Sequence, residues 1–326
     1  MFKGGLTKKL FYFLLIAFSL IAPIIITGKY PQHIMVMCGI WAIASLALNL
    51  ILGYTGQLNL AHGAFFGIGA YGTALLVQRI GLSFWVALPL GCAITAFFGF
   101  LTGLPTLRTK GHYFPIATMC LGIAIYYLIA RWDGLTGGPR GLFGLPRPDP
   151  IRLPFGGVIS FESTPACYYL VLFFVFVTIL IKSRLVKSLA GKKLIAIRGN
   201  EDLAQSVGID TMRGKVVSFT ISTLFAGLAG GLFSAYMGTL MAEQAHYLLS
   251  FEILIYVMIG GIGTMAGPII GGMFLPILGE ILQPLAGFRL ILFGLLLILI
   301  IRYLPSGIVG GLRAAGMHFR WRSGAE

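Results

Sequence analysis

Residues 182–215 read KSRLVKSLAGKKLIAIRGNEDLAQSVGIDTMRGK, and they form the only long charged segment in the interior of a chain that otherwise consists of apolar runs. Three acidic residues accompany the basic ones, which are Lys182, Arg184, Lys187, Lys192, Lys193, Arg198, Arg213 and Lys215. A segment with this much charge does not belong in a hydrocarbon layer. We therefore expect it to be the place where the protein is acted on from outside the membrane.

A short helix is predicted within this segment, over residues 200–208. Asn200 can cap it, because its side-chain oxygen can accept a hydrogen bond from a free N–H group of the first turn. Glu201 and Asp202 then lie where the helix dipole favours negative charge. Gly208 closes the helix, as a glycine after the last turn commonly does. The pattern predicts about two helical turns.

The predicted helix carries an apolar pair, Leu203 and Val207, four residues apart and hence on one face. An isolated helix of this length is unstable in water. Another part of the protein must therefore hold it in place.

The composition of the 326-residue chain identifies it as an integral membrane protein. Hydrophobic residues make up 57%, charged residues 10%, and the mean hydropathy is +0.91, which leaves too little polar surface for a soluble globule. The net charge of +14 is attributed to contacts with anionic lipid, since the bases cluster beside apolar runs and not among exposed aromatics. No nucleic-acid partner is expected. The four cysteines lack the spacing of a disulfide framework or a zinc site.

The fold class expected is all-α: a polytopic bundle of about ten transmembrane helices, because each span needs about 20 apolar residues. We treat residues 1–326 as a single transmembrane domain. The first apolar run is longer than the core of a secretory signal, so we expect it to be retained. The predicted spans are 10–27, 33–52, 58–78, 84–104, 114–130, 165–181, 215–238, 249–260, 264–282 and 288–304.

Lysines and arginines predict the orientation, because they favour the cytoplasmic side. With both termini in the cytoplasm, residues 182–215 form a cytoplasmic loop and residues 305–326 a basic cytoplasmic tail. The outer side then keeps only Lys29, Arg79, Arg131, Arg140, Arg147, Arg152 and Arg289. Residues 131–164, rich in Gly and Pro, become the longest external loop. This loop is either a docking surface for an external partner or a solvated cap over the bundle.

Two glycine-broken stretches lie in the two halves of the chain, at 53–76 and 260–280. The first contains Gln57, Asn59, His62 and Gly63 where a span begins, and polar groups survive in a bilayer only when they are buried in protein or face a wet cavity. Paired broken segments are typical of transporters built from repeats. The alternative is close helix packing through small residues. We favour a translocation pathway bordered by these four residues, and we rank Asn59 above His62 as a candidate substrate contact.

Enzymatic chemistry is not expected. The histidines are scattered, and GIDTMRGKV at 208–216 has one residue too many for a phosphate-binding loop and Val216 in place of its Ser or Thr. No cofactor is expected either. Asp and Glu are absent from the middle of every predicted span, whereas proton- and ion-driven carriers generally need a carboxylate there. The pattern favours an external source of energy.

Four motifs in this order resemble those of branched-chain amino acid ABC transporter permeases of the LivM type. They are LNLILGYTGQLNLAHGAFFGIGAY at 48–71, LTGGPRGL at 135–142, KKLIAIRGNEDLAQSVGID at 192–210 and MIGGIGTMAGPIIGG at 258–272. The resemblance covers most of residues 40–305, and it implies that the single domain is a permease. It further implies a subunit of a high-affinity importer in the bacterial inner membrane, working with a homologous LivH-type permease, two cytoplasmic ATPases and an external substrate-binding protein.

The resemblance also implies that residues 200–208 contact an ATPase. Asp202, Leu203, Ala204 and Gly208 stand at the offsets of the Glu-Ala-Ala-x-x-x-Gly coupling motif of ABC importers, with Asp in place of Glu, Leu in place of the first Ala, and no Ile-x-Leu-Pro downstream. The coupling residues predicted are Asn200, Glu201, Asp202, Leu203, Ala204, Val207 and Gly208. Two alternatives stay open: an ABC permease for urea or short amides, and an autonomous secondary carrier or channel.

Overall fold

The computed structural model describes residues 19–109, 111–152, 157–281, 294–295, 298–299, 302–303 and 307–311. Half of the first predicted span (10–27), most of the last (288–304) and most of the basic tail (305–326) lie outside the described residues.

Five helices of the described chain are long and apolar enough to cross a membrane. They match predicted spans to within a few residues, except that the helix expected at 165–181 continues to Lys187. The extension carries Arg184 and Lys187 in the last turn of the helix. The five are α2 (Lys29–Thr55), α4 (Phe84–Thr106), α5 (Tyr113–Arg131), α7 (Thr164–Lys187) and α10 (Thr211–Met237).

The core lies around α2 and α10, whose central turns are mostly buried, whereas only 22% of the apolar window of α5 is buried. Close approach of backbones brings α10 against α3 (His62–Gln78): a side-chain carbon added to Gly69 on α3 would overlap the backbone of Gly227 on α10. Phe66 and Phe233 pack edge to face in the same interface, with ring centroids 5.5 Å apart. The packing alternative for the glycines of 53–76 is therefore confirmed at Gly69.

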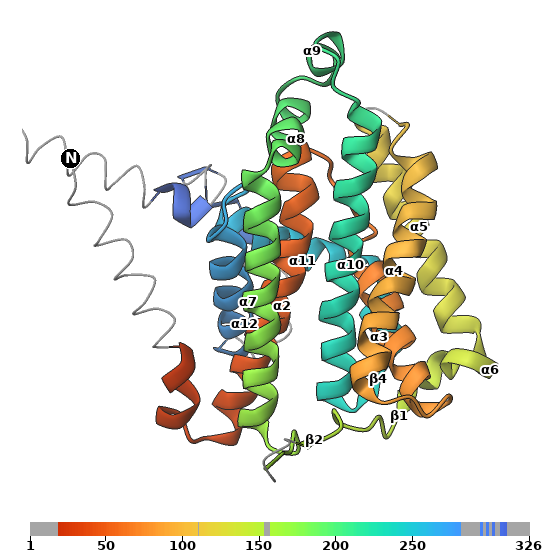
Figure 1. The fold of residues 1–326 in the computed structure, drawn as a ribbon, viewed down its shortest axis with the longest axis vertical. Coiled ribbons are helices and arrows are strands. Elements are labelled where there is room, and N and C mark those ends of the chain that lie inside the picture. The colour runs from red at the N-terminus through yellow and green to blue at the C-terminus, as the bar shows by residue number, and fades with distance from the viewer. Residues whose placement is uncertain are drawn as a thin grey trace, which may run out of the picture.

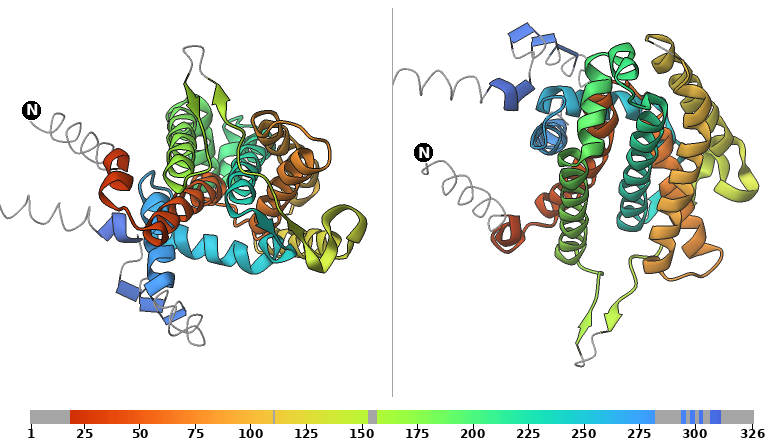
Figure 2. Two further views of the ribbon diagram at one scale, coloured as in Figure 1. Left: turned by 90° about the horizontal axis from the view of Figure 1, so that it is seen from below. Right: turned by 45° about the horizontal axis from the view of Figure 1, so that its top comes forward.

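Two of the predicted spans are shorter than a bilayer crossing: α3 has 17 residues and α11 (Tyr247–Gly260) has 14. At 1.5 Å per residue neither reaches the roughly 30 Å of a hydrocarbon core. The described part of α12 is Gly267–Ile281. The span expected at 58–78 was wrong in its first residues, because 58–61 form a non-helical approach to α3. In the view along the bundle, α11 (light blue) is seen lengthwise and so lies across the long helices (Figure 2).

Charged and irregular segments occupy the two ends of the bundle. α8 (Leu189–Gly199) and α9 (Glu201–Ser206) lie at one end, and β1, β2 and β4 lie at the other (Figure 1). The described residues of 131–163 form turns and short pieces, as expected: α6 (Asp133–Thr136), η1 (Gly138–Arg140), β1 (Leu142–Phe143), β2 (Ile151–Arg152) and β3 (Val158–Ile159). β2 pairs antiparallel with β3, and β1 pairs with β4 (Thr239–Leu240), which precedes η2 (Ala242–Ala245).

Candidate functional site

The short helix predicted at 200–208 is present as α9, at the outermost tip of its end of the bundle (Figure 1). Asn200 caps it, since its side-chain oxygen accepts a hydrogen bond from the backbone N–H of Leu203 at 3.0 Å. Gly208 has a φ of +81°, the left-handed conformation that ends helices and that glycine adopts without strain. Both predictions from the capping pattern are confirmed.

An ion pair holds α9 against the start of α10. The ammonium group of Lys215 lies 2.5 Å from a carboxylate oxygen of Glu201, and the two side chains are only 3% and 24% exposed. Thr211 also donates a hydrogen bond to Glu201, at 3.3 Å, and Gln205 donates one to Thr211 at 2.8 Å. The network supplies the support that such a short helix needs.

A small apolar core joins α8 and α9 to the end of α2. Its buried members are Leu194 and Ile197 on α8, Ala204 on α9, and Leu50 and Tyr54 on α2. α8 and α9 are therefore packed onto a central helix of the bundle. A displacement of the tip would press directly on α2.

The apolar pair of α9 faces outward. Leu203 is 64% exposed and Val207 is 70% exposed, while Ala204 between them is buried. Leu189, at the start of α8, is exposed as well. The many charged residues around this pair argue against contact with lipid tails. An exposed apolar pair in polar surroundings is typical of a site that binds another protein.

The four predicted pathway residues lie between the end of α2 and the start of α3. His62 is fully buried, and its Nε2 lies 3.1 Å from the carbonyl oxygen of Ala44, halfway along α2. Gly63 donates a hydrogen bond from its N–H to Ser250 Oγ of α11, at 2.8 Å. Asn59 is fully buried, whereas Gln57 is half-buried. The segment lies inside the bundle, as the sequence predicted.

Two polar atoms in this segment have no hydrogen-bond partner among the described residues: Asn59 Nδ2 and His62 Nδ1. The oxygen of the Asn59 side chain does accept a bond, from the N–H of Ala61 at 2.9 Å. A buried polar atom without a partner is costly, and native structures contain few of them. Two within four residues mark this depth of the bundle as unusual.

Sequence reasoning missed the groups that tie other elements to α2. Asn49 donates to the carbonyl of Thr264 at 2.7 Å and accepts from the N–H of Gly263 at 2.8 Å, in the loop between α11 and α12. The fully buried Lys182 donates to the carbonyl of Leu46 at 2.8 Å and lies 5.6 Å from the ring centroid of Tyr54. Asn49 falls inside the 48–71 motif, which was the available signal. Lys182 was counted only as a surface base.

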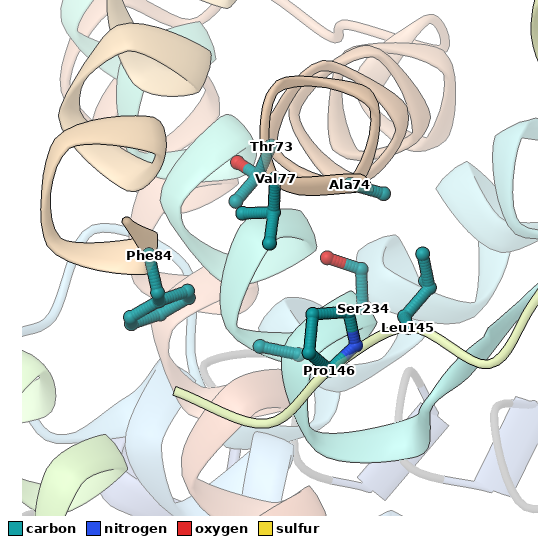
Figure 3. A pocket seen from close by; sticks show the side chains of 8 residues that line it. Thr73, Ala74, Val77, Phe84, Leu145, Pro146 and Ser234 are labelled. Atoms are coloured by element: carbon teal, nitrogen blue, oxygen red, sulfur yellow. The ribbon is translucent and has the colours of Figure 1, made fainter. Parts of the chain in front are cut away.

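A small cavity lies between the last turns of α3 and α10 (Figure 3). Thr73, Ala74 and Val77 of α3 point into it, opposite Ser234 of α10 and beside Phe84, Leu145 and Pro146 (Figure 3). Its accessible space suits at most about one water molecule. It cannot hold an amino acid in this conformation.

Comparison with known proteins identifies the family of the chain. Residues 30–301 match the family model described as "Branched-chain amino acid transport system / permease component". The chain is 31% identical, over 93% of its length and 75% of theirs, to the LivM proteins of Salmonella typhimurium and Escherichia coli, named high-affinity branched-chain amino acid transport system permease proteins.

A second type of permease is also similar. A LivH protein of Methanocaldococcus jannaschii, named as a probable branched-chain amino acid transport permease, is 28% identical over 70% of this chain and 72% of its own. No solved structure matches. The family match and the LivM relatives together carry the assignment: the chain is a multi-pass membrane protein, a permease subunit of an ABC transporter without an ATPase site of its own, and belongs to the branched-chain amino acid transport permease family.

Proposed function

We propose that this permease carries branched-chain or other hydrophobic amino acids into the cell across the bacterial inner membrane, driven by ATP hydrolysis in separate subunits. The names of the LivM and LivH relatives support the substrate class and the pairing with a second, homologous permease. Two cytoplasmic ATPases and an external binding protein complete the proposed importer.

The observation that carries the coupling role is the build of α9. It is capped at both ends, anchored at its base by the Glu201–Lys215 pair, and exposes Leu203 and Val207 at its tip. A rigid helix with two exposed apolar side chains can insert into a cleft of a partner protein, where these side chains lose their contact with water on binding. In this proposal the cleft belongs to an ATPase, whose closure on nucleotide moves α9 and shifts the permease between inward- and outward-facing states.

The proposed orientation places α8, α9 and the connection between α4 and α5 in the cytoplasm. The segment 131–163 is then external, and it docks the binding protein. Support comes from the distribution of bases and from the position of the two segments at opposite ends of the bundle. The complete arrangement has about ten spans, with both termini and the 305–326 tail on the cytoplasmic side.

Gln57, Asn59, His62 and Gly63 border the translocation route in this proposal. The unpartnered Asn59 Nδ2 and His62 Nδ1 support it, since water or a polar solute reaching this depth in another conformational state would supply the missing partners.

The docking proposal is tested by Leu203→Asp combined with Val207→Asp. The matched control is Val158→Asp with Ile159→Asp, which places the same charges on exposed apolar residues of β3 at the opposite end of the bundle. We expect the first variant to insert normally and to lose copurification with the ATPases, and the control to keep it. Normal copurification of Leu203→Asp/Val207→Asp would refute α9 as the docking helix.

The substrate class is tested with the complete importer in vesicles. Leucine, isoleucine and valine are expected to accumulate when ATP and the loaded binding protein are present, and urea is not. Accumulation of urea in place of the amino acids would overturn the substrate assignment while leaving the permease role intact.

A further inference from the structure

Arg198, the penultimate residue of α8, is exposed on one side and lies against three glycines on the other, two at the end of α2 and one in the loop between α11 and α12. Its Nη1 donates a hydrogen bond to the carbonyl of Gly53 at 2.5 Å. A Cβ built on Gly56, which ends α2 with a φ of +74°, would lie 3.3 Å from Arg198 Cγ, and one built on Gly263 would lie 2.5 Å from Nη1. The absence of a side chain at Gly56 and Gly263 therefore leaves the space that the arginine side chain occupies.

The loop at Gly263 separates α11 from α12. Asn49 of α2 fixes this loop by its two hydrogen bonds to Gly263 and Thr264. Thr264 in turn accepts from the N–H of Gly267 at 2.9 Å, at the first residue of α12. The loop is thus hydrogen-bonded to Asn49 of α2, and it also lies beside the guanidinium of Arg198.

The opposite end of this contact leads to the docking helix. Asn200 is the residue that ends α8 and also the residue that caps α9. Since only Gly199 separates it from Arg198, a shift of α9 reaches the guanidinium through rigid helical backbone. The carbonyl of Gly53 and the loop at Gly263 are the first groups of the core that such a shift would meet on this path.

We infer that Arg198 is the positioning residue through which the docking helix acts on the break between α11 and α12, so that motion at the ATPase changes the placement of these two broken helices against α2. The inference rests on the proposed coupling role of α9. It adds a specific contact between the coupling segment and the second glycine-broken stretch, which the sequence alone did not connect.

The test uses the complete importer in vesicles, with ATP hydrolysis and leucine uptake measured per assembled complex. Arg198→Met keeps the aliphatic stem beside Gly56 and removes the donors and the charge. Arg198→Lys keeps charge and donor. The control is Lys193→Met, which removes an exposed base from the same helix.

We expect Arg198→Met to assemble and to hydrolyse ATP normally, while leucine uptake per ATP falls about tenfold, a typical size for coupling between two sites. Arg198→Lys should restore most of the uptake, and Lys193→Met should behave as the unsubstituted complex. Uptake and hydrolysis falling together, unchanged uptake per ATP, or loss of the chain from the membrane in both Arg198 variants would each overturn the inference.

A second readout follows the loop itself. Ala266→Cys places an exposed thiol beside the loop in a Cys120→Ser background, which removes an exposed native cysteine. Trapping the ATPases with nucleotide should change the labelling rate of this introduced thiol in the otherwise unsubstituted and Lys193→Met complexes and leave it constant in Arg198→Met. An equal change in all three would contradict the inference. The two proposals can fail separately. If Leu203→Asp/Val207→Asp loses the ATPases but Arg198→Met keeps normal leucine uptake per ATP, this inference fails and the docking proposal stands.

Discussion

At the base of α9, the carboxylate of Glu201 is bound by Lys215 and Thr211, and the lysine ammonium is almost completely buried. A buried charge of this kind is stabilised by its ion-pair partner, and removal of that partner leaves it uncompensated. The pair therefore fixes the exposed tip of the molecule to α10, although in the sequence both residues look like ordinary solvated charges.

We predict that Glu201→Gln loosens α9 by about 3 kcal/mol, because Lys215 keeps a buried charge without its partner. Hydrogen exchange of residues 200–208 should become faster. Lys193→Gln, which removes an exposed charge from the neighbouring α8, should have little effect, and adding Lys215→Met to Glu201→Gln should recover part of the loss. Equal exchange rates in the Glu201 and Lys193 variants would show that the ion pair does not hold the helix.

Asn59 and Gln57 lie at different depths, which gives a second prediction at this scale. With Cys120 replaced by Ser, Asn59→Cys should resist small polar thiol reagents in the resting permease and react while the complete importer turns over. Gln57→Cys, half-buried, should react in both conditions. A thiol at position 59 that stays inert in every transport state would remove Asn59 from the pathway.

Residue-level prediction from sequence succeeded where the physics is local. Asn200 and Gly208 were identified because capping involves only neighbouring backbone groups. Arg198 and Lys215 were seen only as members of a basic run, since their partners Gly53 and Glu201 are defined by tertiary packing. The role of a charged side chain depends on the groups that pack against it in the fold.

Among the helices, the interrupted ones were harder to predict than the continuous ones. The five long helices follow directly from apolar runs of sufficient length. The stretches at 53–76 and 260–280 were recognised as broken from their glycines, but apolar composition does not show where a helix starts. The non-helical approach at 58–61 and the start of α3 are fixed by contacts with Ala44, Ser250 and Thr118, which sequence periodicity does not contain.

Gly69 and Gly72 on α3 provide a matched pair for testing helix packing. A Cβ at Gly69 would overlap Gly227, whereas the nearest atom to a Cβ at Gly72 is 3.7 Å away. We predict that Gly69→Ala destabilises the purified chain by about 1–3 kcal/mol, the usual cost of overpacking. Gly72→Ala should be neutral or slightly stabilising. Thermal unfolding in detergent distinguishes the two, and similar melting temperatures would contradict the packing of α3 on α10.

For the whole molecule, the sequence predicted which segments share an end of the bundle, and the structure agrees for the described part: 182–215 lies opposite 131–163. Which end faces the cytoplasm is a property of the chain in its membrane and is proposed from its charges. Packing cannot define it, because the same bundle is compatible with either direction.

The orientation is tested with single cysteines in a Cys120→Ser background. A membrane-impermeant maleimide should label Val158→Cys in intact cells and Leu203→Cys only in inside-out vesicles. Both side chains are exposed in the permease chain, so with the ATPases absent access to the reagent depends on the side of the membrane alone. The reverse pattern would invert the proposed topology and place α9 out of reach of cytoplasmic ATPases.

The central claim is that the charged end of the bundle is moved by separate ATPases and that the permease has no driving force of its own. Leucine accumulation against a gradient, measured in vesicles that contain this chain and its partner permease with or without the ATPases, tests it most directly. We predict accumulation only when the ATPases, ATP and the loaded binding protein are all present. Accumulation against the gradient by the permease subunits alone would contradict the account.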